Sequence, residues 1–252
     1  MKAIYSISVL VAAVALFALS VPAYASEMDS RIESSAKQSY VFKTYLKDDD
    51  IKIESRDGAV TLTGFVSDEY HKSLAQETVA GLPGVKSVDN RLEEVKGAPP
   101  PVNSDEWLRD KVKTTLLFHR SVSADTTEVA VKDGIVTLRG YADSQAQKEL
   151  TTEYARDVEG VKYVNNEMIV TKAPNIIRTI GEKVDDASIT AQVKLTLLFH
   201  RSTSAINTKV ETMNGVVTLS GKASNAAELD LATKLANDVY GVKSVTNRMT
   251  IE

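Results

Sequence analysis

A histidine followed by an arginine occurs twice in this chain, inside nearly the same ten letters. Residues 115–124 read TLLFHRSVSA and residues 196–205 read TLLFHRSTSA, so the pair His119 and Arg120 recurs 81 positions later. Imidazole can act as a general base or a metal ligand, and guanidinium binds phosphate. Catalysis also requires a nucleophile at a recognisable spacing, and neither histidine has one. With no cysteine and three scattered histidines, the sequence predicts no transition-metal site and no cofactor.

Both pairs have a structural interpretation. The pattern predicts that an amphipathic helix ends just before each pair. A cation there meets the negative end of the helix dipole and can bond the last free carbonyls, which contributes about 0.3–1 kcal/mol. We therefore interpret His119, His200 and Arg201 as caps at the C-terminal ends of their own helices. A phosphate or lipid-headgroup contact is the functional alternative. The equivalent place earlier in the chain carries Lys43 and Thr44, which argues against catalysis.

The duplicated stretch belongs to a unit that occurs three times. Three hairpin-like segments, separated by 76 and then 81 residues, read RDGAVTLTG (56–64), KDGIVTLRG (132–140) and MNGVVTLSG (213–221). At the same offsets follow GVKSVDNRL (84–92), GVKYVNNEM (160–168) and GVKSVTNRM (241–249). A period near 80 exceeds that of the usual solenoids, so we expect tandem small domains at 28–96, 105–172 and 187–252. The predicted linkers are 97–104, which contains three prolines and should be stiff, and 173–186.

Within each unit the pattern predicts the order αββαβ. Leu108, Val112 and Leu116 lie on one face of a first helix. Two alternating segments joined by Asp-Gly or Asn-Gly predict a β-hairpin, because both turn residues need positive φ. A second helix and a last strand follow. The predicted fold class is α+β, with three tandem domains, each a three-stranded mixed sheet with two helices packed on one face. The strand order stays open.

Nine glycines have predicted conformational roles and form no phosphate-loop or dinucleotide motif. They lie in the hairpin turns, at the exits from the hairpins and at the end of each second helix. In that order they are Gly58, Gly134 and Gly215, then Gly64, Gly140 and Gly221, then Gly84, Gly160 and Gly241.

The first 25 residues have the pattern of a secretory signal peptide. Lys2 precedes an apolar run that is too short to span a bilayer, and the segment ends on Ala-Tyr-Ala at Ala25. We expect cleavage after Ala25, export to the periplasm and no transmembrane segment in the mature chain. The absence of cysteine excludes a lipid anchor on an N-terminal cysteine as well as disulfides. The net charge of −4 lacks the basic footprint of a nucleic-acid-binding protein.

The repeated pattern resembles the BON domain of bacterial envelope proteins. The similarity rests on the helix ending LLFHRS, the hairpin DG-x-V-T-L-x-G and the segment G-V-K-x-V-x-N, and it covers nearly all of the chain after Ala25. A signal peptide followed by tandem units is similar to the hyperosmotically inducible periplasmic OsmY family. That resemblance implies a non-enzymatic role in envelope stress, with binding of phospholipid surfaces or chaperoning of exported proteins.

One helix carries the candidate residues for a lipid surface. Trp107 is the only tryptophan, and Arg109, Lys113 and Arg120 follow it at spacings of four and seven residues, roughly on one face. An aromatic anchor with flanking cations suits an anionic membrane surface. The neighbouring acids weaken this interpretation, and a partly buried tryptophan is the structural alternative.

Two functions therefore stay open, and the preferred partner is an anionic phospholipid surface. The alternative is a soluble holdase for unfolded exported or outer-membrane proteins. Binding of a small ligand or cation is a third possibility. The sequence does not determine the oligomeric state.

Overall fold

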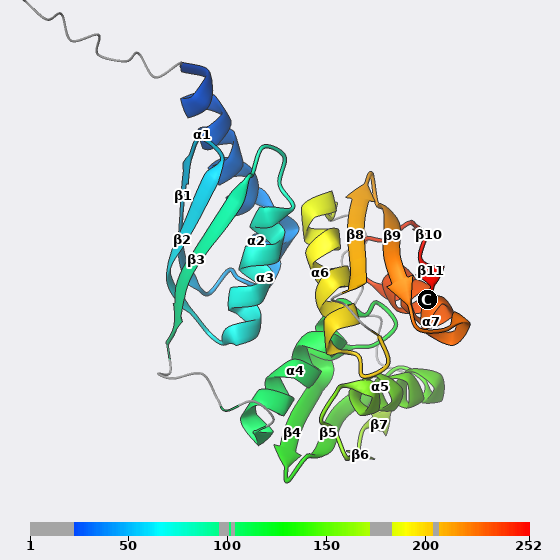
Figure 1. Cartoon of the computed structure of the whole chain (residues 1–252). Helices are drawn as coiled ribbons and strands as arrows, with labels where there is room; N and C mark the ends of the chain where they lie inside the picture. Colours follow the sequence, from blue (N-terminus) through cyan, green and yellow to red (C-terminus); the bar gives the residue numbers. More distant parts are fainter. Residues whose placement is uncertain (1–22, 96–100, 102–103, 172–182, 204–206) are drawn as a thin grey trace, which may run out of the picture.

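The computed structural model describes residues 23–95, 101, 104–171, 183–203 and 207–252. Three αββαβ units follow one another, numbered 1 to 3 in chain order (Figure 1). Most of the predicted signal peptide and of the predicted linkers lies outside the described residues. Ser104 and Asp185, which the sequence analysis assigned to linkers, are the N-caps of the first helices of units 2 and 3.

The elements of the three units correspond closely. Unit 1 consists of α1 (Ala23–Gln38), α2 (Tyr40–Thr44), β1 (Asp50–Arg56), β2 (Ala59–Val66), α3 (Glu69–Ala80) and β3 (Ser87–Glu94). Unit 2 consists of α4 (Asp105–Phe118), the 3-10 turn η1 (Ala124–Thr126), β4 (Thr127–Lys132), β5 (Ile135–Ala142), α5 (Gln145–Asp157), β6 (Tyr163–Asn166) and β7 (Ile169–Val170). Unit 3 consists of α6 (Asp186–Phe199), β8 (Thr208–Met213), β9 (Val216–Ala223), α7 (Ala226–Asp238), β10 (Ser244–Asn247) and β11 (Thr250–Ile251).

Each sheet has the second strand of its hairpin at the centre. This strand pairs antiparallel with the strand before it and parallel with the strand after the second helix, as in the order β1-β2-β3. In units 2 and 3 the last strand is interrupted, so β6 and β7 both pair with β5, and β10 and β11 both pair with β9. The predicted mixed sheets are therefore confirmed, and the structure supplies the strand order.

A clasp that the sequence analysis missed fastens the hairpin turn in every unit. In unit 2, Asp133 and Gly134 have φ of 54° and 79°, as a turn of this type requires. Their amides donate to the carboxylate of Asp105, in the first turn of α4, at 2.7 and 2.9 Å. These bonds lower the pKa of Asp105. The residues at the same repeat position, Asp29 and Asp186, make the same pair of bonds in units 1 and 3.

The second helices end earlier than predicted. The sequence pattern predicts their ends at Gly84, Gly160 and Gly241, but the C-caps are Gly81, Val158 and Val239. The three predicted glycines lie beyond the caps, at φ of 90° to 93°. In units 2 and 3 the cap residue is extended because it pairs with a segment of the other unit, as described below.

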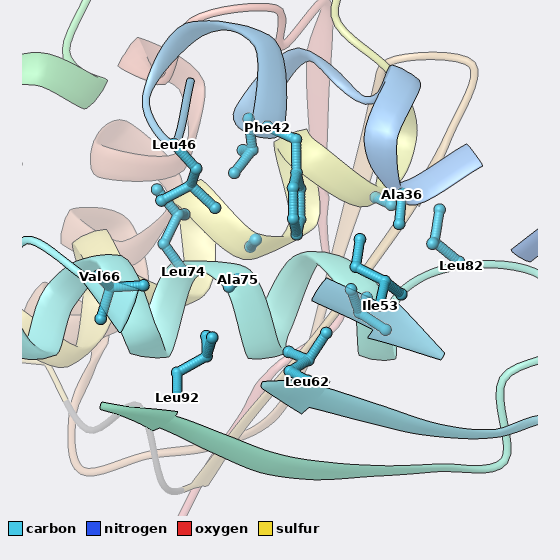
Figure 2. Packing of buried hydrophobic residues seen from close by; sticks show 14 of the residues in the cluster. Ala36, Phe42, Leu46, Ile53, Leu62, Val66, Leu74, Ala75, Leu82 and Leu92 are labelled. Atoms are coloured by element: carbon cyan, nitrogen blue, oxygen red, sulfur yellow. The ribbon is translucent and has the colours of Figure 1, made fainter. Parts of the chain in front are cut away.

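The hydrophobic core of unit 1 continues into the other units. Figure 2 shows side chains of α2 and α3 packed over the strands of unit 1. The same cluster contains Ala187, Ala191 and Leu195 of α6, whereas Ile189 and Val193 face the core of unit 3. Helix α6 is thus buried on opposite sides, which fixes unit 1 against unit 3.

Candidate functional site

The two His-Arg segments lie where units 2 and 3 meet. At the end of α4, the carbonyl of Phe118 accepts a hydrogen bond from the amide of Tyr240 at 3.0 Å. The amide of Arg120 in turn donates to the carbonyl of Asp238 at 3.0 Å. These bonds form a short antiparallel bridge between His119 and Val239, just beyond the end of α7.

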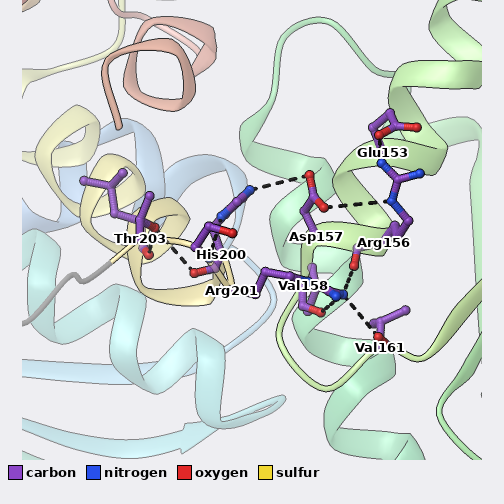
Figure 3. A network of polar contacts seen from close by, with 10 residues as sticks. Glu153, Arg156, Asp157, Val158, Val161, His200, Arg201 and Thr203 are labelled. Carbon is purple, nitrogen blue, oxygen red and sulfur yellow. Dashed lines mark hydrogen bonds and ion pairs between the residues drawn. The ribbon is translucent and has the colours of Figure 1, made fainter. Parts of the chain in front are cut away.

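The second His-Arg segment, at the end of α6, makes the equivalent contact with unit 2. The amide of Glu159 donates to the carbonyl of Phe199 at 3.2 Å, and the amide of Arg201 donates to that of Asp157 at 3.0 Å. Each residue lies 81 positions from its counterpart in the first bridge, so the interface is related by an approximate twofold axis. We call the two bridges and their side chains the latch; Figure 3 shows the half at the end of α5.

Asp238 is the polar centre of the latch. Its carboxylate accepts hydrogen bonds from Ser121 at 2.5 Å, Tyr154 at 2.6 Å and Nδ1 of His119 at 3.1 Å. Burial opposes the ionisation of Asp238, but these hydrogen bonds outweigh it and hold its pKa below the usual range. His119 is fully buried and stacks on the Tyr154 ring with centroids 3.8 Å apart. The carboxylate therefore joins residues of two units around a buried imidazole.

The other half is more open. Nε2 of His200 lies 3.6 Å from a carboxylate oxygen of Asp157, whose side chain is 36% exposed, against 15% for Asp238. The two halves share a backbone geometry but differ in side-chain burial.

The arginines act on the other unit's helix, which corrects the expectation from the sequence. We predicted that Arg201 would bond the end of its own helix. Its guanidinium instead donates to the carbonyls of Arg156, Val158 and Val161, at the end of α5 in unit 2. Arg120 likewise bonds the carbonyl of Asn237 in α7. The favourable charge at a helix C-terminus is present, but it is supplied across the interface.

Unit 1 is attached differently because it lacks the motif, and Gly81 stands where units 2 and 3 carry the latch aspartates. Its first helix is broken at Ser39, and the amides of Tyr40 and Val41 donate to Asp185 and Ser188 of unit 3, at 2.7 and 3.1 Å. Aromatic rings complete the contact: Tyr45 meets Phe118 with ring centroids 5.6 Å apart, and Tyr70 meets Phe199 at 5.0 Å.

Three of the four lipid candidates make internal contacts. Trp107 is partly buried between the cores of units 1 and 2, and its carbonyl accepts a hydrogen bond from Tyr70 at 2.9 Å. Arg109 pairs with Asp110 at 2.8 Å, and Arg120 belongs to the latch. Only Lys113 is exposed without an ion pair within the part of the chain that the structure describes. The predicted cationic face around Trp107 is thus largely built into the junction of the units.

The better-buried histidine of the latch is occupied by structural contacts. His119 is buried against an aromatic ring, and its only hydrogen-bond partner is a carboxylate. Among the described residues, no group of three or more His, Cys, Asp or Glu side chains could hold a metal ion. Nor does any helix in the described ranges combine the length and the apolar composition needed to cross a bilayer. The observed contacts of the His-Arg segments join units 2 and 3.

The comparisons agree with the repeat architecture. The family model of the BON domain matches residues 28–96, 104–172 and 185–252. The chain belongs to the BON-domain family. "Osmotically-inducible protein Y" of Escherichia coli (strain K12) is 33% identical to this BON protein over 201 residues, covering 78% of this chain and 95% of that protein.

Two more distant similarities complete the comparison. "Outer membrane lipoprotein DolP" of Haemophilus influenzae is 31% identical to this BON protein over 142 residues, covering 56% of this chain and 71% of that protein. A solved structure of CdsD, a structural protein of the type III secretion system of Chlamydia trachomatis, is 18% identical and covers 90% of this chain and 92% of that one, with a TM-score of 0.24.

The sequence contained signals for two features that the analysis missed. The clasp residues Asp29, Asp105 and Asp186 recur at the offsets of 76 and 81 that define the repeats. Helix α6 has apolar residues on more than one face, and Asp186 and Lys194 are its only charged residues, which is typical of a helix buried between two cores. Asp157 and Asp238 also recur at the 81-residue offset, but nothing local indicates that their partners lie in another unit.

Two histidines should respond to pH in opposite directions. Burial lowers the pKa of His200 below its ordinary value of 6.5, because the charge of Asp157 compensates only partly. Burial also acts to lower the pKa of His71. The hydrogen bond to Asp49 at 2.6 Å and nearby acidic groups outweigh burial, so the pKa of His71 is raised.

The consequence is measurable as the free energy of unfolding at several pH values. Because the pKa of His200 is lowered in the folded protein, its contribution to stability is present at pH values above 6.5. That contribution is lost as the pH falls through the pKa of the folded state. Because the pKa of His71 is raised in the folded protein, its contribution to stability is present at pH values below 6.5. That contribution is lost as the pH rises through the pKa of the folded state. Relative to wild type, we expect His200→Asn to gain stability on acidification and His71→Gln to lose it. The same trend in both variants would contradict these environments.

Proposed function

We propose that this BON protein is a non-enzymatic protein of the bacterial envelope that shields apolar segments of unfolded exported polypeptides. The observation that carries this proposal is the open sheet face of unit 2. The predicted signal peptide supports a periplasmic location, and the similarity to an osmotically inducible protein supports a role in osmotic stress. The latch supports a binding protein rather than an enzyme, because its histidines are used for assembly.

The open sheet face consists of the outward residues of β5 and its neighbours. Ile135 is paired in register with Tyr163, and Tyr141 with Ile169. All four side chains are exposed, Tyr163 to 64% and Ile169 to 58%. The two pairs are six positions apart along β5, a separation of roughly 20 Å. A flat surface with two apolar anchors at this distance suits an extended polypeptide segment.

Unit 3 lacks this surface, and unit 1 keeps only one of its anchors, the exposed Phe65 at the position of Tyr141, beside Ser87 and Glu93. The residues equivalent to Tyr141, Tyr163 and Ile169 in unit 3 are Lys222, Ser244 and Thr250. The charges between the apolar pairs are balanced, since Arg139 pairs with Glu167 at 2.8 Å. A neutral face with aromatic anchors favours apolar polypeptide over a highly charged partner, and exposed apolar patches of this kind mark interaction sites.

The repeats supply a fold-compatible test. The variant Tyr141→Lys, Tyr163→Ser and Ile169→Thr gives unit 2 the residues of unit 3. Light scattering should show that wild type suppresses aggregation of an outer-membrane protein diluted from urea. Losing the two tyrosines should cost about 2 kcal/mol of binding free energy, a drop of roughly thirty-fold in affinity.

The matched control is Met213→Lys. Met213 is 73% exposed but lies in unit 3, and its equivalent in unit 2 is Lys132. This control should retain full suppression. No suppression by wild type, or equal loss in both variants, would refute the proposal.

Docking on anionic phospholipid is the second candidate, and the tyrosines favour it. Tyr141 and Tyr163 have amphipathic rings that suit a membrane interface, and the exposed Lys132 lies on the same face. Co-sedimentation with phosphatidylglycerol vesicles and with phosphatidylcholine vesicles separates this candidate from the first. Equal, negligible pelleting with both would exclude it.

A further inference from the structure

A cleft of about 470 Å³ lies between units 1 and 2 and plays no part in the latch or the open sheet face. One wall is formed by the start of α3 and the end of β3, and the other by one face of α4. Its volume falls within the range of small-molecule sites, about 300–1,000 Å³. We propose that this cleft binds a small zwitterion of amino-acid size, with one ammonium and one carboxylate group.

The wall from unit 1 holds an oriented imidazole. The carboxylate of Asp49 is 2% exposed and accepts hydrogen bonds from the amide and hydroxyl of Ser67, at 2.8 and 2.7 Å. It also holds Nδ1 of His71 at 2.6 Å, and His71 lines the cleft. In units 2 and 3 the position of His71 is occupied by Gln147 and Glu228, which cap their own helices. In unit 1 Asp49 makes that capping bond, and His71 is an oriented imidazole whose Nε2 donates a hydrogen bond when the ring is protonated.

The same wall offers an acceptor for an ammonium group. Oε1 of Glu94 is buried and accepts no hydrogen bond from an N–H or hydroxyl donor, while the carboxyl of Glu69 lies within hydrogen-bonding reach of Glu94. Burial raises the pKa of Glu94, and the nearby carboxylates of Glu69 and Asp68 raise it further. A cationic group placed there would supply the missing hydrogen bond and offset the crowding of negative charge.

The wall from α4 supplies the opposite charge. Lys113 projects from the helix face that lines the cleft and, among the described residues, makes no ion pair. Arg109 is already paired with Asp110, so Lys113 and protonated His71 are the donors for a carboxylate. Val95 and Leu117 add an apolar part of the lining. Donors, acceptor and apolar surface within one cleft match the groups of an amino acid.

Helix α6 shows that such a cleft is not required to join units. Its equivalent face also meets unit 1, but it carries Ala187 and Ala191 where α4 carries Glu106 and Asp110. A Cβ at Gly81 would come within 3.3 Å of Ala187, so this contact is closed. At the corresponding contact of α4, the charged residues Glu106 and Asp110 line the cleft.

The test uses the full mature chain with glycine, L-leucine, L-glutamate and L-lysine as probes, each titrated to about 10 mM by calorimetry and thermal shift. Acetate and n-butylammonium, which carry one charge each, are the controls. We expect at least one amino acid to bind with one-to-one stoichiometry and to raise the Tm, while neither single-charge control does.

Variants locate the binding. Lys113→Met and Glu94→Gln should each weaken binding by about ten-fold or more. Lys37→Met, at the same repeat position on the exposed face of α1, should leave binding unchanged. Circular dichroism melts confirm that each variant is folded. No binding by any probe, equal binding of a single-charge control, or unchanged affinity in both cleft variants would overturn the inference. The proposed client binding uses another surface, so the two proposals can fail separately.

Discussion

Replacing Asp238 with alanine should lower the free energy of unfolding by about 3 kcal/mol. The substitution removes the acceptor for Ser121, Tyr154 and His119 at once, and it leaves the imidazole of His119 buried without its partner. Removing one member of a buried hydrogen-bonded pair costs more than the pair contributes, because the remaining group keeps its desolvation penalty. Urea denaturation followed by circular dichroism measures the loss.

The internal symmetry provides the control for this prediction. Asp157→Ala makes the same change at the twofold-related position, where the carboxylate is 36% exposed and its nearest His200 nitrogen lies 3.6 Å away. We expect a loss of at most about 1 kcal/mol there, as for solvent-screened pairs. Hydrogen exchange should also show faster exchange of the Arg120 and Tyr240 amides in Asp238→Ala, since these amides form the bridge. Equal losses in the two variants would contradict the asymmetric latch.

Gly140→Ala should destabilise unit 2 by about 3–5 kcal/mol. Gly140 has a φ of +117°, and a Cβ there would lie 1.9 Å from the carbonyl oxygen of Thr126. That oxygen belongs to the backbone leading into β4, which pairs with β5 at Gly140, so it cannot move without breaking the pairing. Tyr141 follows directly on β5, so the variant should also disturb the open sheet face.

Gly134→Ala is the comparison for Gly140→Ala. Gly134 also has positive φ, +79°, but the nearest atoms to an added Cβ belong to the side chain of Lys162, which can move. The expected cost is about 1–2 kcal/mol, from the backbone conformation alone. Thermal unfolding of both variants compares a steric clash with the backbone, in Gly140→Ala, with the cost of a positive φ alone, in Gly134→Ala. Similar Tm values for the two variants would contradict this difference.

The amino-acid sequence by itself determined the local structure of each unit. Turn residues such as Asp133 and Gly134, and the cap Ser144 with its partner Gln147, act on backbone groups within a few residues, so a short stretch contains the information. The three-fold repetition strengthened the prediction of αββαβ units. The strand order was not available in this way, because alternation indicates which face is buried but not which strands are neighbours.

Only the tertiary structure decided what joins the units. His119 meets Asp238 across 119 positions of the chain, and Trp107 is covered by Tyr70 of another unit. Several amphipathic helices with similar faces could pair in many ways, and local patterns do not select among them. The choice depends on the burial of α6 on both sides and on the helix break at Ser39, after which the amides of Tyr40 and Val41 find acceptors in unit 3. For this reason the sequence predicted that a cation would bond the C-terminal end of a helix. Only the tertiary structure showed that this helix belongs to another unit.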